Sequence, residues 1–111
     1  MRVTTILGCA LLWMIASVTP VMAQDAGAAL VSKAMCTACH QMDAASIGPT
    51  WRAIAARHAA RKQLMTDALV SKVIHGGGGS WGLVPMVPNQ RVNEKEARVM
   101  VEWILAQTTT Q

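Results

Sequence analysis

The chain has 111 residues and a formal net charge of +4, with ten Lys and Arg side chains against six Asp and Glu. The basic residues are spread along the sequence, which excludes the dense basic clusters by which proteins bind nucleic acids. The length corresponds to a single domain whose apolar core would be marginal without further support.

The first 23 residues are typical of a secretory signal peptide. Arg2 supplies a positive charge, an almost uncharged apolar stretch follows from Ile6 to Val18, and the sequence Val21-Met22-Ala23 suits signal peptidase. We therefore expect residues 1–23 to be cleaved after Ala23, which leaves residues 24–111 as the mature domain. A retained membrane anchor is the alternative, although the apolar stretch is short for a bilayer span.

Helix-forming residues from Ala26 to Met35 predict a first helix that leads into Cys36-Thr37-Ala38-Cys39-His40. C-x-x-C-H is the attachment motif of c-type haem: the two thiols form thioethers with the porphyrin, and the histidine ligates the iron. On a turn of helix, residues three and four apart share a face, so Cys36, Cys39 and His40 would lie together. The motif predicts one covalently bound haem c, which would also enlarge the buried core.

Two other kinds of site use C-x-x-C. A structural zinc site needs a second pair of ligands, and outside the motif only His58 and His75 remain, 17 residues apart. A thioredoxin-like site needs a βαβ pattern, and no alternating strand is visible. Loss of Cys9 with the signal peptide would also leave no cysteine for a structural disulfide in an oxidising compartment. Haem attachment is therefore favoured.

Two helices are expected in the middle of the chain. A loop rich in Gly, Pro and Ser ends at Thr50, a candidate N-cap for a helix from Trp51 to about His58. A further helix from about Lys62 to His75 should end at four consecutive glycines. The apolar positions expected to form its inner stripe are Leu64, Met65, Ala68, Leu69 and Val73.

An extended loop and a closing helix complete the chain. Two prolines exclude a helix over residues 80–89. Asn93 and Glu96 then form a capping-box pattern, which predicts the start of the last helix. The tail from Thr108 to Gln111 is expected to be disordered. The apolar stripe of the last helix consists of Ala97, Met100, Val101, Ile104 and Leu105.

The second axial ligand of the haem iron decides the function. Among the five methionines of the mature chain, Met86 lies in the proline-rich loop, 46 residues after His40, and this distance allows the chain to reach the opposite face of the porphyrin. His58 and His75 stay open as alternative ligands, as does an open site. The other methionines adjoin the motif or lie on apolar helix stripes: Met35, Met42, Met65 and Met100.

A combination of motifs resembles the small bacterial class I c-type cytochromes. It consists of the C-x-x-C-H motif, then Gly48-Pro49, then Trp81-Gly82-x-x-Pro85-Met86-x-Pro88-Asn89, and a last helix that carries Trp103. The resemblance covers nearly the whole mature chain. It implies an all-α class I cytochrome c fold with four or so helices around one haem, His40 and Met86 as axial ligands, and electron transfer as the function.

The resemblance also implies supporting roles around the haem. Pro49 would accept a hydrogen bond from the second ring nitrogen of His40. Trp51 and Trp81 would donate their indole N–H groups to the haem propionates, with simple burial as the alternative, and Asn89 would hydrogen-bond near the methionine sulfur.

Gly27 would lie where the first and last helices cross, against Trp103. Members of the resembled family commonly carry a phenylalanine near the position of Val31, whereas this chain has no Phe or Tyr. The packing between the first and last helices is therefore expected to differ from the family pattern.

We expect a soluble, monomeric electron carrier in the periplasm that exchanges electrons with redox partner proteins and is not an enzyme. Binding of nucleic acid and stable membrane insertion after signal cleavage are not expected. The alternatives are a haem subunit docked on a larger dehydrogenase or reductase and, in third place, a haem peroxidase or gas sensor. Basic side chains that could form a positive rim for partners are Lys33, Arg52, Arg57, Arg61, Lys62 and Lys72.

Overall fold

The structure, a computed structural model, describes residues 21–107, so most of the predicted signal peptide and the predicted disordered tail lie outside the described residues. Within them the regular structure is helical, apart from one antiparallel bridge between Gly77 and Met86. None of the described helices combines the length and apolar character needed to cross a membrane. The elements are α1 (Val21–Lys33), the 3-10 turn η1 (Cys36–Ala38), α2 (Trp51–His58), the 3-10 turn η2 (Ala59–Arg61), α3 (Lys62–His75) and α4 (Glu94–Leu105).

Helix α1 differs at both ends from the predicted range of Ala26 to Met35. It begins at Val21 and ends at Lys33. The early end has a clear cause, because Met35 adopts the left-handed conformation with φ 63°, which a right-handed helix cannot continue. The haem motif therefore lies on the separate turn η1 and not on the last turn of α1.

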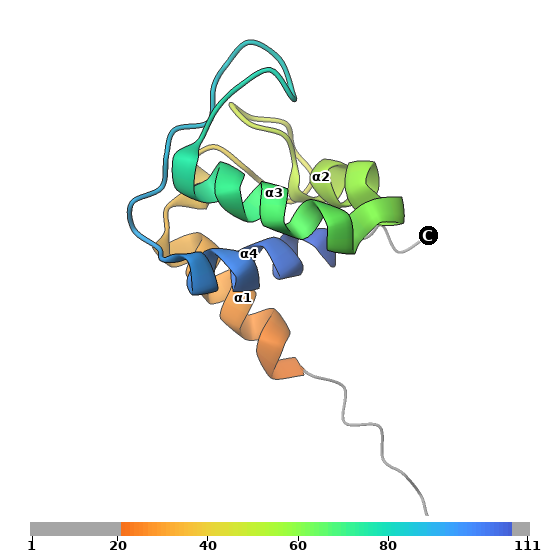
Figure 1. The fold of residues 1–111 in the computed structure, drawn as a ribbon, viewed down its shortest axis with the longest axis vertical. Helices are drawn as coiled ribbons and strands as arrows, with labels where there is room; N and C mark the ends of the chain where they lie inside the picture. Colours follow the sequence, from red (N-terminus) through yellow and green to blue (C-terminus); the bar gives the residue numbers. More distant parts are fainter. Residues whose placement is uncertain (1–20, 108–111) are drawn as a thin grey trace, which may run out of the picture.

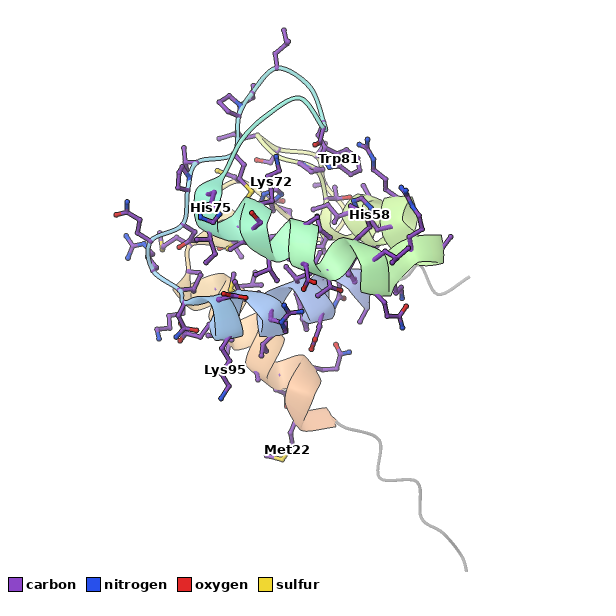
Figure 2. The ribbon with its side chains drawn as sticks, viewed as in Figure 1. Met22, His58, Lys72, His75, Trp81 and Lys95 are labelled. Atoms are coloured by element: carbon purple, nitrogen blue, oxygen red, sulfur yellow. The ribbon has the colours of Figure 1, made fainter. Side chains whose placement is uncertain are left out.

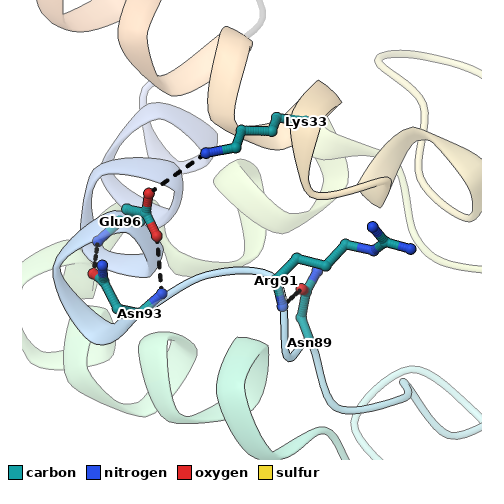
Figure 3. Close-up of polar contacts among 5 residues, drawn as sticks. All are labelled: Lys33, Asn89, Arg91, Asn93 and Glu96. Atoms are coloured by element: carbon teal, nitrogen blue, oxygen red, sulfur yellow. Dashed lines mark hydrogen bonds and ion pairs between the residues drawn. The ribbon is translucent and has the colours of Figure 1, made fainter.

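Helix α4 is the centre of the packing, since it contacts α1, α2 and α3. Its start is the predicted capping box: the backbone N–H of Glu96 donates to Asn93 Oδ1 over 2.9 Å, and that of Asn93 donates to Glu96 Oε2 over 3.0 Å (Figure 3). Lys33 of α1 also reaches Glu96, with 3.9 Å between Nζ and Oε1. The predicted apolar stripe is confirmed, because all five of its residues are buried: Ala97, Met100, Val101, Ile104 and Leu105.

The crossing of α1 and α4 depends on a glycine. Gly27 is buried, and a Cβ atom at this position would overlap the Cβ of Trp103. Trp103 in turn meets Trp51 edge to face, with ring centroids 6.1 Å apart. This confirms the contact that the family resemblance implied, and Val31, where the resemblance led us to expect different packing, is buried at 2% exposure.

Helices α2 and α3 begin and end where the sequence predicted. Thr50 caps α2 by accepting a hydrogen bond of 3.0 Å from the Ala53 N–H, and α3 ends at His75, directly before Gly76, whose φ of 69° lies in the left-handed region. Beyond α3 the chain forms a long loop that rises above α3 and descends to the start of α4 (Figure 1).

The predicted inner stripe of α3 is partly wrong. Leu64 is 79% exposed, whereas Val70, which was not assigned to the stripe, is buried in the core with Val73. The reason is that α3 carries two apolar faces. One packs on α4, and the other, formed by Met65, Ala68 and Leu69, lines a cleft.

Candidate haem site

A cleft of about 1310 Å³ brings together all eight residues predicted to bind the haem. One part of its wall comes from η1 and the residues after it, and another part comes from the long loop between α3 and α4. The eight residues are Cys36, Cys39, His40, Pro49, Trp51, Trp81, Met86 and Asn89. The sequence separation between the first and last of them shows that tertiary folding, and not local structure, creates this cleft.

The chemistry of the cleft wall suits haem, which has a flat apolar ring and two carboxylate groups. Most of the lining side chains are apolar. The charged ones are Arg57, Arg61, Lys72 and Arg91, and no Asp or Glu of the described residues is among them. Apolar walls with a purely cationic set of charges match an apolar macrocycle with anionic substituents.

His40 is held on several sides. Its side chain is 7% exposed, and its Nδ1 lies 2.7 Å from the Pro49 carbonyl oxygen, which is the contact that the resemblance implied. The Trp51 ring stacks on the imidazole with centroids 4.7 Å apart and an angle of 26°. A Cβ atom on Gly48 would lie 2.7 Å from Nδ1. With Nδ1–H donating to a carbonyl, Nε2 carries the lone pair that a metal ligand needs.

The two cysteines lie on the short turn that precedes His40. The backbone N–H groups of Cys39 and His40 both donate to the Cys36 carbonyl, over 3.1 and 3.0 Å. Neither cysteine forms a disulfide, and each is half-buried. Burial raises the pKa of the Cys36 thiol, and the neighbouring Cys39 raises it further. Both thiols are therefore available, side by side on the wall of the cleft, for thioether bonds.

Met86 reaches the cleft because the glycine run turns the loop back. Its N–H donates to the Gly77 carbonyl and its carbonyl accepts from the Gly77 N–H, both over 2.9 Å. Gly77 has a φ of 121°, which disfavours other residues at this position. Met35, Met65 and Met100 also line the cleft, whereas Met42 does not.

The two alternative histidines occupy different environments (Figure 2). His75 does not line the cleft, and its Nδ1 contacts the Ser71 carbonyl of its own helix over 3.1 Å. His58 lines the cleft, is 7% exposed, and its Nδ1 is buried without a hydrogen-bond partner among the described residues. Burial lowers the pKa of His58, and the positive charges of Arg57 and Arg61 lower it further.

The side chains of the other predicted site residues differ in exposure and contacts. Trp51 is 4% exposed, whereas Trp81 is 46% exposed and has the Arg57 guanidinium 4.5 Å from its ring centroid. The Asn89 amide donates to the Ala34 carbonyl over 3.0 Å and lies 3.9 Å from Cys36 Sγ. The expected hydrogen bond of Asn89 near the methionine sulfur stays a prediction. The backbone N–H of Asn89 bonds to Val73, which directs its side chain toward α1.

Sequence reasoning missed two features of the cleft. It did not identify Arg91 as a lining residue, and it did not predict that His58 is buried in the wall. The position of His58 could have been found, because it follows Trp51 by seven residues and so lies on the same face of α2. For Arg91, which lies in an irregular loop, no periodic signal exists.

Comparisons with known proteins agree with this geometry. Residues 24–108 match the sequence profile of the family described as "Cytochrome c". The chain is 42% identical over 76 residues to cytochrome c-551 of Allochromatium vinosum, a match that covers 68% of this chain and 80% of that protein. The chain is 39% identical over 81 residues to cytochrome c-552 of Nitrosomonas europaea, a match that covers 73% of this chain and 78% of that protein.

Similarity extends to three dimensions. The crystal structure of wild-type Nitrosomonas europaea cytochrome c552 superimposes with a TM-score of 0.68 at 36% identity, over 73% of this chain and 99% of that one. The arrangement of helices around the cleft is therefore similar to that of cytochrome c552, and the fold class expected from the sequence is confirmed.

Proposed function

Because this chain belongs to the cytochrome c family, we propose that it carries single electrons between redox partner proteins on one haem c whose iron is ligated by His40 and Met86. The haem is bound covalently through Cys36 and Cys39. The observation that supports the proposal is that the loop between α3 and α4 brings Met86 to the cleft lined by the C-x-x-C-H motif, whereas the other three methionines of the cleft adjoin the motif or lie on helices α3 and α4.

The chemistry of the cofactor is simple: haem iron with a histidine and a methionine ligand alternates between the ferric and ferrous states and so carries one electron. The residues of the chain set the conditions for this change. The Pro49 carbonyl, 2.7 Å from His40 Nδ1, and the stacked Trp51 ring hold the imidazole in one orientation. A ligand that is held in this way moves little when the iron changes charge, which favours fast electron transfer.

We further propose that the cationic wall of the cleft holds the haem carboxylates. Trp81 and Trp51 would donate indole N–H bonds to them, and the four positive side chains that line the cleft would balance their charge. This assignment is supported by the lack of any Asp or Glu among the described lining residues, because an acidic neighbour would repel a haem carboxylate.

The cell compartment is a further part of the proposal. The pattern of residues 1–23 supports export with cleavage after Ala23, and the family match begins at residue 24, where the mature domain would start. We propose that residues 24–111 act in the periplasm as a monomer that meets its redox partners by diffusion.

A pair of variants of the haem-loaded protein tests the ligand. In wild-type protein, a closed iron should leave the reduced spectrum unchanged under carbon monoxide. Met86→Ala should bind carbon monoxide at once and have a lower reduction potential, because loss of the thioether removes a ligand that favours the ferrous state. Met65→Ala is the matched control, since Met65 also lines the cleft but lies on α3. A wild-type spectrum and potential in Met86→Ala would contradict the proposal.

One observation supports the second candidate, a haem subunit docked on a larger dehydrogenase or reductase. Leu83, an apolar residue at the rim of the cleft, is 101% exposed. Purification from native membranes and periplasm with the holoprotein as bait separates the two candidates. A stoichiometric complex that survives gel filtration would favour the docked subunit, and elution of the holoprotein at the monomer size would favour the diffusing carrier.

A further inference from the structure

The loop that carries Met86 is anchored well at its base and weakly at its tip. At the base, the Asn89 N–H donates to the Val73 carbonyl over 3.0 Å, and the Asn89 amide reaches the Ala34 carbonyl. The pairing of Gly77 with Met86 closes the loop on itself and does not join it to a helix. The loop can therefore move as a unit about its two ends unless its tip is also attached.

Two glycines make the tip itself a loosely packed segment. Gly79 and Gly82 have φ values of 88° and 126°, and a Cβ atom at either would meet nothing within 4 Å. The only hydrogen bond between them closes the turn, from the Gly79 N–H to the Gly82 carbonyl over 3.2 Å. Packing therefore does not hold the tip against the helices.

Arg57 supplies the missing attachment. Its Nη1 donates to the Ser80 carbonyl over 2.5 Å, and its guanidinium lies over the Trp81 ring, 4.5 Å from the centroid. Within the described part of the chain, no other hydrogen bond or ring contact joins residues 78–85 to the helices. Figure 2 shows the Trp81 side chain at the end of the loop, close to the region of α2 that carries His58.

We propose that Arg57 is a positioning residue that fixes the tip of this loop to α2 and thereby slows the release of Met86 from the iron. The inference rests on the proposed ligation by Met86. The guanidinium has a planar face that stacks on an indole and N–H groups that donate in the same plane, so one side chain makes both contacts. The contact also holds the Trp81 ring at the wall of the cleft.

The test measures how fast imidazole replaces the sixth ligand in the ferric holoprotein. At saturating imidazole the exchange rate reaches a limit, which is the rate at which Met86 leaves. Arg57→Gln should raise this limiting rate by roughly tenfold, equivalent to about 1.4 kcal/mol. The limiting rate of Arg57→Lys should lie between those of the wild-type protein and Arg57→Gln, because lysine keeps the charge over the ring but loses the planar guanidinium.

Lys62→Gln is the matched control, because it also removes one positive charge, whereas Lys62 lies at the start of α3 and does not line the cleft. Its limiting rate should stay within about twofold of the wild-type rate. Equal rates in Arg57→Gln and Lys62→Gln would overturn the inference. If Arg57→Gln does not fold, Trp81→Leu replaces it, and an unchanged limiting rate in Trp81→Leu would equally overturn it.

The same measurement distinguishes this inference from the ligand proposal. If the wild-type protein shows no limiting rate, Met86 does not occupy the sixth position, and both proposals fail. If the wild-type protein shows a limiting rate and Met86→Ala shows none, the ligand proposal holds. The Arg57 variants alone then decide the role of the loop tip. In the double variant Arg57→Gln/Trp81→Leu, the limiting rate should rise above the wild-type rate by less than the product of the two single-variant fold-changes. The reason is that both substitutions remove the same contact.

Discussion

Replacement of Gly48 by alanine would place a methyl group against the His40 imidazole. The new Cβ would lie 2.5 Å from Cε1 and 2.7 Å from Nδ1, whereas ordinary contacts begin at 3.4 Å, so the ring would have to move by about 0.7 to 0.9 Å. It cannot move freely, because Nδ1 is bonded to Pro49 and Trp51 stacks on the ring. Overpacking of this kind costs about 1–3 kcal/mol.

The assay for Gly48→Ala is guanidinium unfolding of the ferric holoprotein, combined with a measurement of its reduction potential. We expect the free energy of unfolding to fall by about 1–3 kcal/mol. We also expect the potential to rise, because a longer bond to Pro49 makes the imidazole a weaker donor to ferric iron. An effect on both quantities would locate the strain at the ligand and not only in the packing around it.

The matched control for Gly48→Ala is Gly78→Ala. A Cβ on Gly78 would approach Pro85 to 3.3 Å, a distance at which a small shift of an exposed loop suffices. We expect its unfolding free energy to stay within about 0.5 kcal/mol of the wild-type value. Equal stability and equal potential for Gly48→Ala and Gly78→Ala would refute the conclusion that Gly48 restrains the imidazole.

Three further predictions concern other parts of the structure. The folded-state pKa of His58 lies below its unfolded value of about 6.5, so the unfolded chain binds more protons in acid. The contribution of His58 to stability is complete above the unfolded pKa and should fall as the pH is lowered through about 6.5 toward the folded pKa. His58→Phe should flatten the slope of unfolding free energy against pH between about pH 5 and 8. An unchanged slope would assign the pH dependence to other groups. Gly27→Ala should lower the free energy of unfolding by about 1–3 kcal/mol through the overlap with Trp103 Cβ, and an unchanged free energy of unfolding would contradict the close crossing of α1 and α4. Without covalent haem, as in Cys36→Ser/Cys39→Ser, circular dichroism should show no cooperative unfolding, and a native-like transition would disprove the dependence of the core on haem.

Features that depend on neighbouring residues could be predicted from the sequence. The capping box of Asn93 and Glu96, the N-cap at Thr50 and the end of α3 at Gly76 each involve groups at most four residues apart. The haem motif belongs to the same class, because its two cysteines and its histidine share one turn. In these cases backbone geometry alone brings the groups together.

Features that depend on packing could not be predicted with the same certainty. Leu64 follows the apolar period of α3 but is exposed, because it lies on neither of the two faces by which α3 meets α4 and the cleft, and the period does not say where those faces fall. The left-handed conformation of Met35 ended α1 early, although nothing in its residue type favours that conformation.

The sequence by itself determined the haem attachment site, the family and the helices, because each is encoded in a local pattern of residue types. Only the tertiary structure decided that Asn89 bonds to Ala34, 55 residues away, that His58 is buried in the cleft wall, and that Arg57 meets Trp81. Such contacts depend on how helices and loops that are distant in the chain pack together. The packing follows from the burial of many side chains at once, so no single motif specifies it.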